Sequence, residues 1–277
     1  MRNCFLVFLI ALPVILFSQS ENQNEKGKFF AYWGYNRAWY STSDIHLKGS
    51  DYNFTLYNVE AKDRPSKFSF HDYVSPQRIW IPQYNYRVGY FFHKNYSISL
   101  GLDHMKYVMI KNQELEVSGT IDSTRSKQYQ GNYNKEKVVI APDFLLFEHT
   151  DGLNYLSIDV DRFDQLFAIK NKFRFYLSEG LNAGPVIPRT DVRLFTEGLN
   201  NKFHLAGVGV GLKAGLHITV FERFFVRSDV KYGYITLPNV LTTGKKEDRA
   251  KHHFTFFQYY IVAGINFHFP PKKTMKE

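Results

Sequence analysis

Residues 206–220 read AGVGVGLKAGLHITV. The even positions, from Ala206 to Val220, are all apolar, whereas the odd positions carry glycine, lysine, histidine or threonine. Because successive side chains of a strand point to opposite faces, this alternation predicts one long β-strand with an apolar face and a polar face. A tilted strand needs about 9–11 residues to cross the hydrocarbon of a bilayer, and this stretch is longer than that.

Seven further segments repeat the two-residue period. In the last of them, apolar side chains from Phe257 to Phe269 share one face, and Gln258 and Asn266 lie on the other. Together with 206–220, the segments predict about eight antiparallel strands. The seven segments are 29–40, 81–92, 96–103, 156–161, 173–186, 224–234 and 257–269.

The links between these segments alternate in length. Three are tight, at 93–95, 171–172 and 222–223, whereas the links 41–80, 109–152, 188–202 and 238–252 are long. An up-and-down outer-membrane barrel alternates in this way, with short periplasmic turns and long outer loops. The pattern therefore predicts an all-β fold, an up-and-down antiparallel transmembrane β-barrel over residues 29–269.

The first twenty residues have the features of a secretory signal peptide. Arg2 precedes an apolar run, 5–17, and Ser18-Gln19-Ser20 offers small residues for cleavage. The run is shorter than the roughly 20 residues of a spanning helix, which disfavours the alternative of a retained anchor. We therefore expect export, with 1–20 removed and 21–28 as a polar lead-in. The one cysteine, Cys4, would be removed as well.

Composition narrows the possible partners. Aromatic residues make up 17% of the chain, and such residues favour strands and membrane interfaces. The formal net charge of +9 suits polyanions. Since the sequence has no helix–turn–helix pattern and no zinc-ligand spacing, we expect outer-membrane lipid and lipopolysaccharide as partners and no nucleic acid.

In these patterns the sequence resembles the small eight-stranded outer-membrane barrels of Gram-negative bacteria. The resemblance covers 29–269 and includes the final Phe267-His268-Phe269, since such barrels use a terminal aromatic residue as an assembly signal. It implies an outer-membrane location and contact with the barrel assembly machinery through the strand that ends at Phe269. The chain departs from the family pattern by a short basic tail, 270–277.

The polar faces of the strands predict what fills the barrel. An eight-stranded barrel has an interior that side chains just fill, and an unpaired buried charge costs several kcal/mol. We therefore expect a plugged polar core of paired charges instead of an open pore. Its predicted members are Arg87, Asp103, Asp159, Asp161, Arg174, Lys213, Arg227, Asp229 and Lys231.

One group could carry catalysis. His149, Thr150 and Asp151 combine a base, a hydroxyl nucleophile and an orienting carboxylate, and they resemble the His-plus-hydroxyl pair of outer-membrane lipid A deacylases. Two features depart from the deacylase pattern. Thr150 replaces the usual serine, and adjacent residues of a strand, such as His149 and Thr150, point to opposite faces. The alternative is a polar loop end.

A basic loop is a candidate for contact with lipopolysaccharide. Charge-assisted hydrogen bonds to phosphate are strong, and the alternative is a solvated loop. The residues are Lys245, Lys246, Arg249 and Lys251.

These patterns favour a barrel with a structural or surface-interaction role and without a cofactor or metal. Two alternatives remain open at this point. One is a lipid A or phospholipid acyl hydrolase in the same barrel, and the other is a secreted soluble β-sandwich binding module.

Overall fold

The computed structural model describes residues 24–170, 172–198 and 201–268. This part of the chain is built almost entirely from antiparallel strands, so the prediction of an antiparallel all-β fold is confirmed. The elements are β1 (Phe29–Tyr40), β2 (Ser43–Lys48), β3 (Tyr52–Val59), β4 (Ala61–Lys62), α1 (Phe70–Val74), β5 (Tyr84–Phe91), β6 (Tyr96–Met109), β7 (Gln113–Ile121), β8 (Gly131–Ile140), β9 (Leu145–Ile169), β10 (Phe173–Val186), β11 (Asp191–Leu194), β12 (Gly207–Val220), β13 (Phe224–Leu241) and β14 (Arg249–Phe267).

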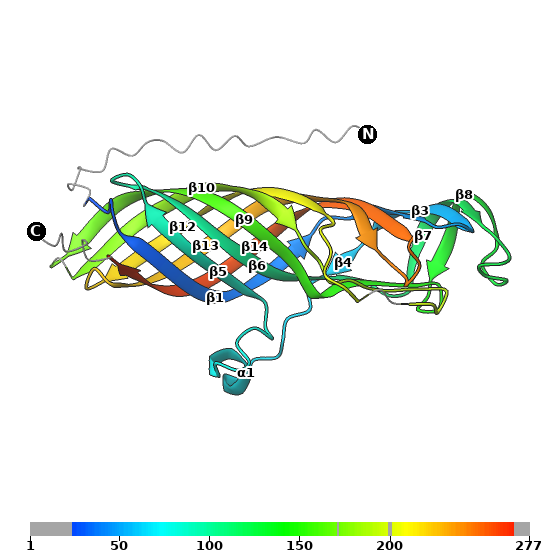
Figure 1. Cartoon of the computed structure of the whole chain (residues 1–277), viewed down its shortest axis with the longest axis horizontal. Helices are drawn as coiled ribbons and strands as arrows, with labels where there is room; N and C mark the ends of the chain where they lie inside the picture. Colours follow the sequence, from blue (N-terminus) through cyan, green and yellow to red (C-terminus); the bar gives the residue numbers. More distant parts are fainter. Residues whose placement is uncertain (1–23, 171, 199–200, 269–277) are drawn as a thin grey trace, which may run out of the picture.

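Eight of these strands pair in a cycle. Hydrogen-bonded neighbours follow the order β1-β5-β6-β9-β10-β12-β13-β14, and β1 pairs with β14 as well as with β5. Figure 1 shows these strands crossing the long axis obliquely. We call them the eight-strand ring. Each overlaps one of the eight segments that the alternation predicts, and β1 and β10 have the predicted bounds.

The tight links lie together at one end of the ring, which we call the inner end. Phe29 pairs with both Tyr90 and Phe267, so the start of β1, the end of β5 and the end of β14 share this end. The chain turns back here between β5 and β6, between β9 and β10, and between β12 and β13.

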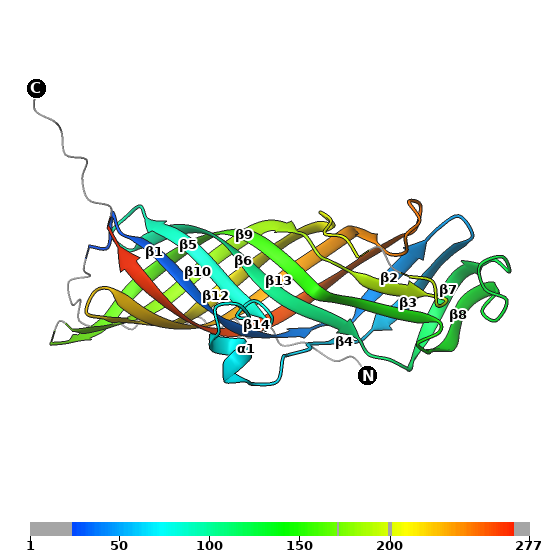
Figure 2. The same ribbon diagram turned by 60° about the horizontal axis from the view of Figure 1, so that its bottom comes forward.

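The long links are partly folded into strands, whereas the sequence analysis expected loops throughout, so that expectation is corrected. They contain β2, β3, β4, β7, β8 and β11, and they lengthen β9, β13 and β14 beyond the predicted segments. These strands continue the sheet from β14 through β2, β3 and β7 to β8. Figure 2 shows them beyond the ring, at the end opposite the tight turns. We call this part the outer region; it comprises the six strands above with residues 104–109, 145–153, 235–241 and 249–256.

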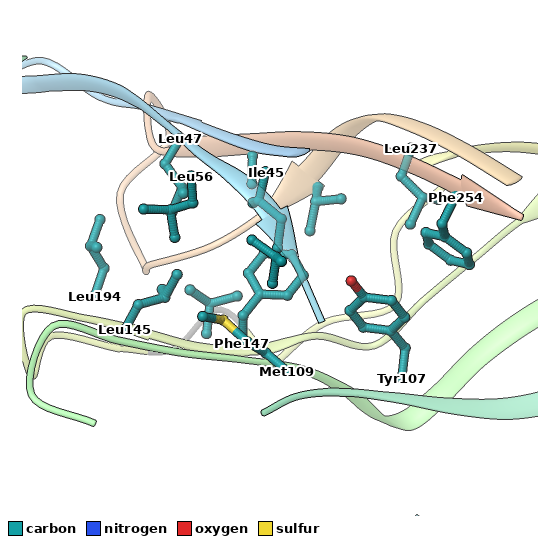
Figure 3. Packing of buried hydrophobic residues seen from close by; sticks show 14 of the residues in the cluster. Ile45, Leu47, Leu56, Tyr107, Met109, Leu145, Phe147, Leu194, Leu237 and Phe254 are labelled. Carbon is teal, nitrogen blue, oxygen red and sulfur yellow. The ribbon is translucent and has the colours of Figure 1, made fainter. Parts of the chain in front are cut away.

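The outer region encloses an apolar core. Ile45, Leu47 and Leu56 belong to one cluster with Phe147 and Leu237, and all five are fully buried. Figure 3 shows side chains of the cluster meeting between strands on opposite sides of the core. The strands that supply them alternate as strongly as those of the ring, for example Tyr52, Phe54 and Leu56 in β3.

The ring has the opposite arrangement. Its outward face is apolar, with Leu212 at 59% and Ile158 at 56% exposed, while its inward face carries buried charges. In the described part of the chain, no helical segment has the length and apolar character that a membrane crossing requires. The expected signal peptide, 1–20, and the residues from Phe269 onward lie outside the described residues.

Candidate functional site

Eight charged side chains form one continuous series of ion pairs inside the ring. They come from β5, β6, β9, β12 and β13, and each is at most 1% exposed. Acids and bases alternate in the series, which runs Lys231, Asp103, Arg87, Asp159, Lys213, Asp161, Arg227, Asp229. Four positive and four negative groups leave the series with no net formal charge. We call it the ion-pair chain.

The distances join the series into one network. Arg87 lies 2.8 Å from Asp103 and 3.2 Å from Asp159. Arg227 lies 3.2 Å from Asp161 and 2.6 Å from Asp229. Lys213 bridges the two halves, since it contacts both β9 carboxylates. Removing two charges from water is costly, and only well-placed partners and hydrogen bonds offset that cost.

Neutral polar side chains add hydrogen bonds to the network. Asn85 donates to Asp103 over 2.6 Å, and Ser157 donates to Asp159 over 2.6 Å. The ammonium of Lys231 lies 5.6 Å from the Tyr155 ring centroid, within the range of a cation–π interaction. Sequence reasoning did not include these residues, although Asn85 and Ser157 occupy inward positions of the predicted alternation.

The ninth predicted lumen residue, Arg174, lies apart from the ion-pair chain. It starts β10 at the inner end and pairs with Glu222 over 2.6 Å. The Glu222 side chain is 53% exposed, so this ion pair belongs to the turn region.

Apolar side chains close both ends of the polar interior. At the inner end, an aromatic cluster surrounds a cavity of about 10 Å³, which is at most the space for one water molecule. At the outer end, the apolar core of the outer region begins directly beyond the ion-pair chain, with Met105 and Tyr155. The inner cluster is made of Phe30, Tyr32, Phe91, Phe163, Tyr176, Phe225, Tyr260 and Val262.

The structure does not bring the candidate catalytic residues together. His149 is fully buried, and its Nδ1 lies 2.8 Å from Thr190 Oγ1. Asp151 is exposed and pairs with Arg189 at 3.4 Å instead. Thr150 is the intervening strand residue and points to the opposite face. Among the residues that the structure describes, no carboxylate contacts His149, so they do not form the triad that the sequence suggested.

His149 contacts a second histidine instead. Its Nε2 lies 3.2 Å from His252 Nε2, and both rings are packed among aromatic side chains of the outer core. Within the described ranges, no group of three or more His, Cys, Asp or Glu side chains could hold a metal ion.

A second buried ion pair ties the far end of the outer region together. Arg125 lies 3.5 Å from Asp248 and 2.7 Å from Glu197, and its guanidinium stacks over the Tyr52 ring at 5.1 Å. Burial, and next the nearby Asp248 carboxylate, raises the pKa of Tyr52, so its phenol stays neutral. Sequence reasoning missed this group because its members are far apart in the chain.

The predicted basic loop lies on the surface of the outer region, but Arg249 and Lys251 belong to β14, so only Lys245 and Lys246 lie in a loop. Lys245 lies 3.6 Å from Glu197, and Arg249 donates to Asn239 over 3.0 Å. Lys246 and Lys251 are exposed. The four cations therefore divide into two that meet protein partners and two that face solvent.

No protein-family model matches the chain, and no curated protein matches it at a significant level. Solved structures of small outer-membrane β-barrels are similar to it. OprG from Pseudomonas aeruginosa matches with a TM-score of 0.44 and 12% identity, over 90% of this chain and 99% of OprG. AlkL, solved in lipid bilayers, matches with a TM-score of 0.41 and 13% identity, over 94% of this chain and 98% of AlkL. Ail of Yersinia pestis matches with a TM-score of 0.33 and 12% identity, over 87% and 99%. The similarity is one of overall architecture and assigns no role to any residue.

Proposed function

We propose that this chain is an exported outer-membrane β-barrel with a closed lumen, which holds a folded outer region on the cell surface for a structural or surface-interaction role. The eight-strand ring is the membrane-spanning part, with its tight turns on the periplasmic side. The observation that carries the proposal is the reversed polarity of the ring, which is apolar outside and charged inside.

The outward side chains support the membrane assignment. A run of aliphatic residues on neighbouring strands is exposed, and apolar surface of this extent marks contact with lipid or protein. Because the strands pair in a cycle, every strand of the ring has neighbours on both sides, which lipid requires. A water-soluble β-sandwich would place these side chains inside. The exposed residues include Val88, Ile98, Leu100, Ile158, Val160, Leu181, Val208, Val210, Leu212, Leu216, Val226, Val230, Ile261 and Ile265.

The interior supports a closed lumen. Eight paired charges occupy the middle, and aromatic or aliphatic clusters occupy the two ends. A conducting pore needs a continuous water path, which such packing excludes. Since no catalytic triad forms around His149, the outer region is better suited to binding than to hydrolysis.

Membrane fractionation and planar-bilayer recording test the proposal together. We expect the protein in the outer-membrane fraction, with a shift in gel mobility on boiling, and no steady conductance above that of the empty bilayer. Recovery without detergent in the soluble fraction would contradict the membrane assignment. Large steady conductance would contradict the closed lumen alone.

A further inference from the structure

A segment between β4 and β5 stands out from the wall of the ring. Residues 65–81 contain α1, which has no buried residue, and both views show α1 beside the ring, away from the outer core. Phe70 is 76% exposed and Phe68 is 72% exposed, and Val74, Trp80 and Ile81 are exposed as well. So many exposed apolar side chains on one short segment require a partner surface.

The segment is held in a defined position. The Tyr35 hydroxyl donates to the Tyr73 carbonyl over 2.6 Å, and the two rings lie 4.7 Å apart. Arg78 pairs with Asp72 at 2.7 Å, and the Lys106 ammonium donates to the Ile81 carbonyl over 3.2 Å. The Tyr35 and Lys106 contacts attach the segment to the outward faces of β1 and β6, and the Arg78–Asp72 ion pair joins two parts of the segment itself.

The attachment point lies in the outer part of the apolar band. Tyr35 pairs in register with Ile261 and Tyr84, and Ile261 belongs to the exposed apolar residues of the ring. On the inner side of Tyr35, the next outward residue of β1 is Trp33, whereas on the outer side it is the exposed Arg37. Beyond Arg37 comes the exposed Trp39, which pairs with Phe257 at the end of the apolar stretch of β14. Tyr35 therefore lies in the outer part of the apolar band, close to the edge where aromatic residues gather in membrane proteins.

We infer that residues 65–81 are an interfacial anchor, which inserts Phe68, Phe70 and Trp80 among the acyl chains of the outer leaflet. This inference rests on the proposed membrane location of the ring. The occupant is lipid because the exposed side chains continue the apolar band directly. The flanking cations Arg37, Lys67 and Lys106 complement the phosphate groups of the lipid surface.

A fluorophore at three single cysteines tests the anchor. In a Cys4→Ser background, the introduced cysteine is the only one in the chain. Phe70→Cys reports on the segment, and Leu212→Cys reports on the outward face of the ring. Gly244→Cys, where an added Cβ would meet no atom within 4 Å, reports on an exposed outer loop. Each labelled protein is folded into phosphatidylcholine–phosphatidylglycerol vesicles with or without brominated acyl chains, and gel mobility before boiling verifies folding.

We expect brominated lipid to quench the fluorescence of the label at position 70 as strongly as at position 212. The fluorescence at position 244 should not change. Emission at position 70 that matches position 244, with position 212 quenched, would overturn the anchor and leave the barrel intact. An unquenched label at position 212 would overturn the membrane location and the anchor with it. If the fluorescence at position 70 changed with the number of protein molecules per vesicle and not with bromine, the segment would contact a second copy of the chain. The inference would then be wrong.

Discussion

Strand β14 passes through both regions of the molecule, and its two faces exchange polarity on the way. In the ring, Gln258 and Tyr260 point inward while Phe257 and Ile261 point outward. In the outer region, Phe254 and Phe256 are buried while Lys251 and His253 are exposed. The alternation continues without a break, so the change lies in the residue types alone.

Strands β13 and β6 show the same exchange. The inward residues of β13 change from Arg227, Asp229 and Lys231 to Ile235 and Leu237. Those of β6 change from serine and aspartate to Met105, Tyr107 and Met109. A sheet that contacts lipid must be apolar outside, and one that contacts water must be polar outside. For a ring that spans the membrane as proposed, the exchange predicts the outer edge of lipid contact near residues 255–257 of β14.

Breaking the ion-pair chain tests the ring, and we expect it to lower the free energy of unfolding more than the changes that follow. Asp103→Asn removes the carboxylate that pairs with Lys231, and loss of one partner of a buried pair costs about 3–5 kcal/mol. Urea unfolding in vesicles, followed by gel mobility, measures the change. The double variant Asp103→Asn/Lys231→Met removes one charge of each sign and should recover much of the loss. Equal stability of the single variant and wild type would refute the buried network.

A cavity in the apolar core tests the outer region. Leu56→Ala should cost about 2–5 kcal/mol, because the leucine is fully buried among apolar side chains. The loss should be confined to the outer region. We therefore expect faster hydrogen exchange in β2, β3 and β7 and unchanged exchange in β10 and β12. Equally faster hydrogen exchange in the ring and in the outer region would show that the two regions unfold as one unit.

Charges on the two outward faces should have different effects. Leu212→Arg places a cation on the proposed lipid face, which costs about 2–4 kcal/mol near the bilayer midplane. The matched variant Glu116→Arg lies on the exposed face of β7 and should change stability by about 0.5 kcal/mol or less. Both are measured by urea unfolding in vesicles. The same small effect for both variants would mean that water covers the two faces alike.

We expect the smallest change in stability from substitutions of the basic residues 245–251. Lys246→Gln/Lys251→Gln should weaken binding of lipopolysaccharide at low salt and leave stability within about 0.5 kcal/mol, because both side chains face solvent. Lys245→Gln is the control, since its ammonium lies near Glu197. Binding of the double variant that equals wild type would argue for a loop that is merely solvated.

Period-two alternation was enough to find the strands of the ring, because their outward faces are apolar and their inward faces are polar or charged. It failed for β2, β3 and β7, although Ile45, Leu47 and Leu115 also alternate with polar residues. There the length of the links led to an expectation of loops. Contacts such as His149 with His252, 103 residues apart, depend on strand register, which the pattern of a single segment does not encode.

A spin-label scan along β14 tests the central claim most directly. Labels are placed one at a time at outward positions 251, 253, 255, 257, 259, 261 and 265, and their collisions with oxygen and with a water-soluble nickel chelate are compared. The polarity exchange predicts water contact at 251, 253 and 255, lipid contact from 257 to 265, and a crossover between Thr255 and Phe257. Water contact at every position would contradict a membrane-spanning ring, and lipid contact at every position would contradict a water-exposed outer region.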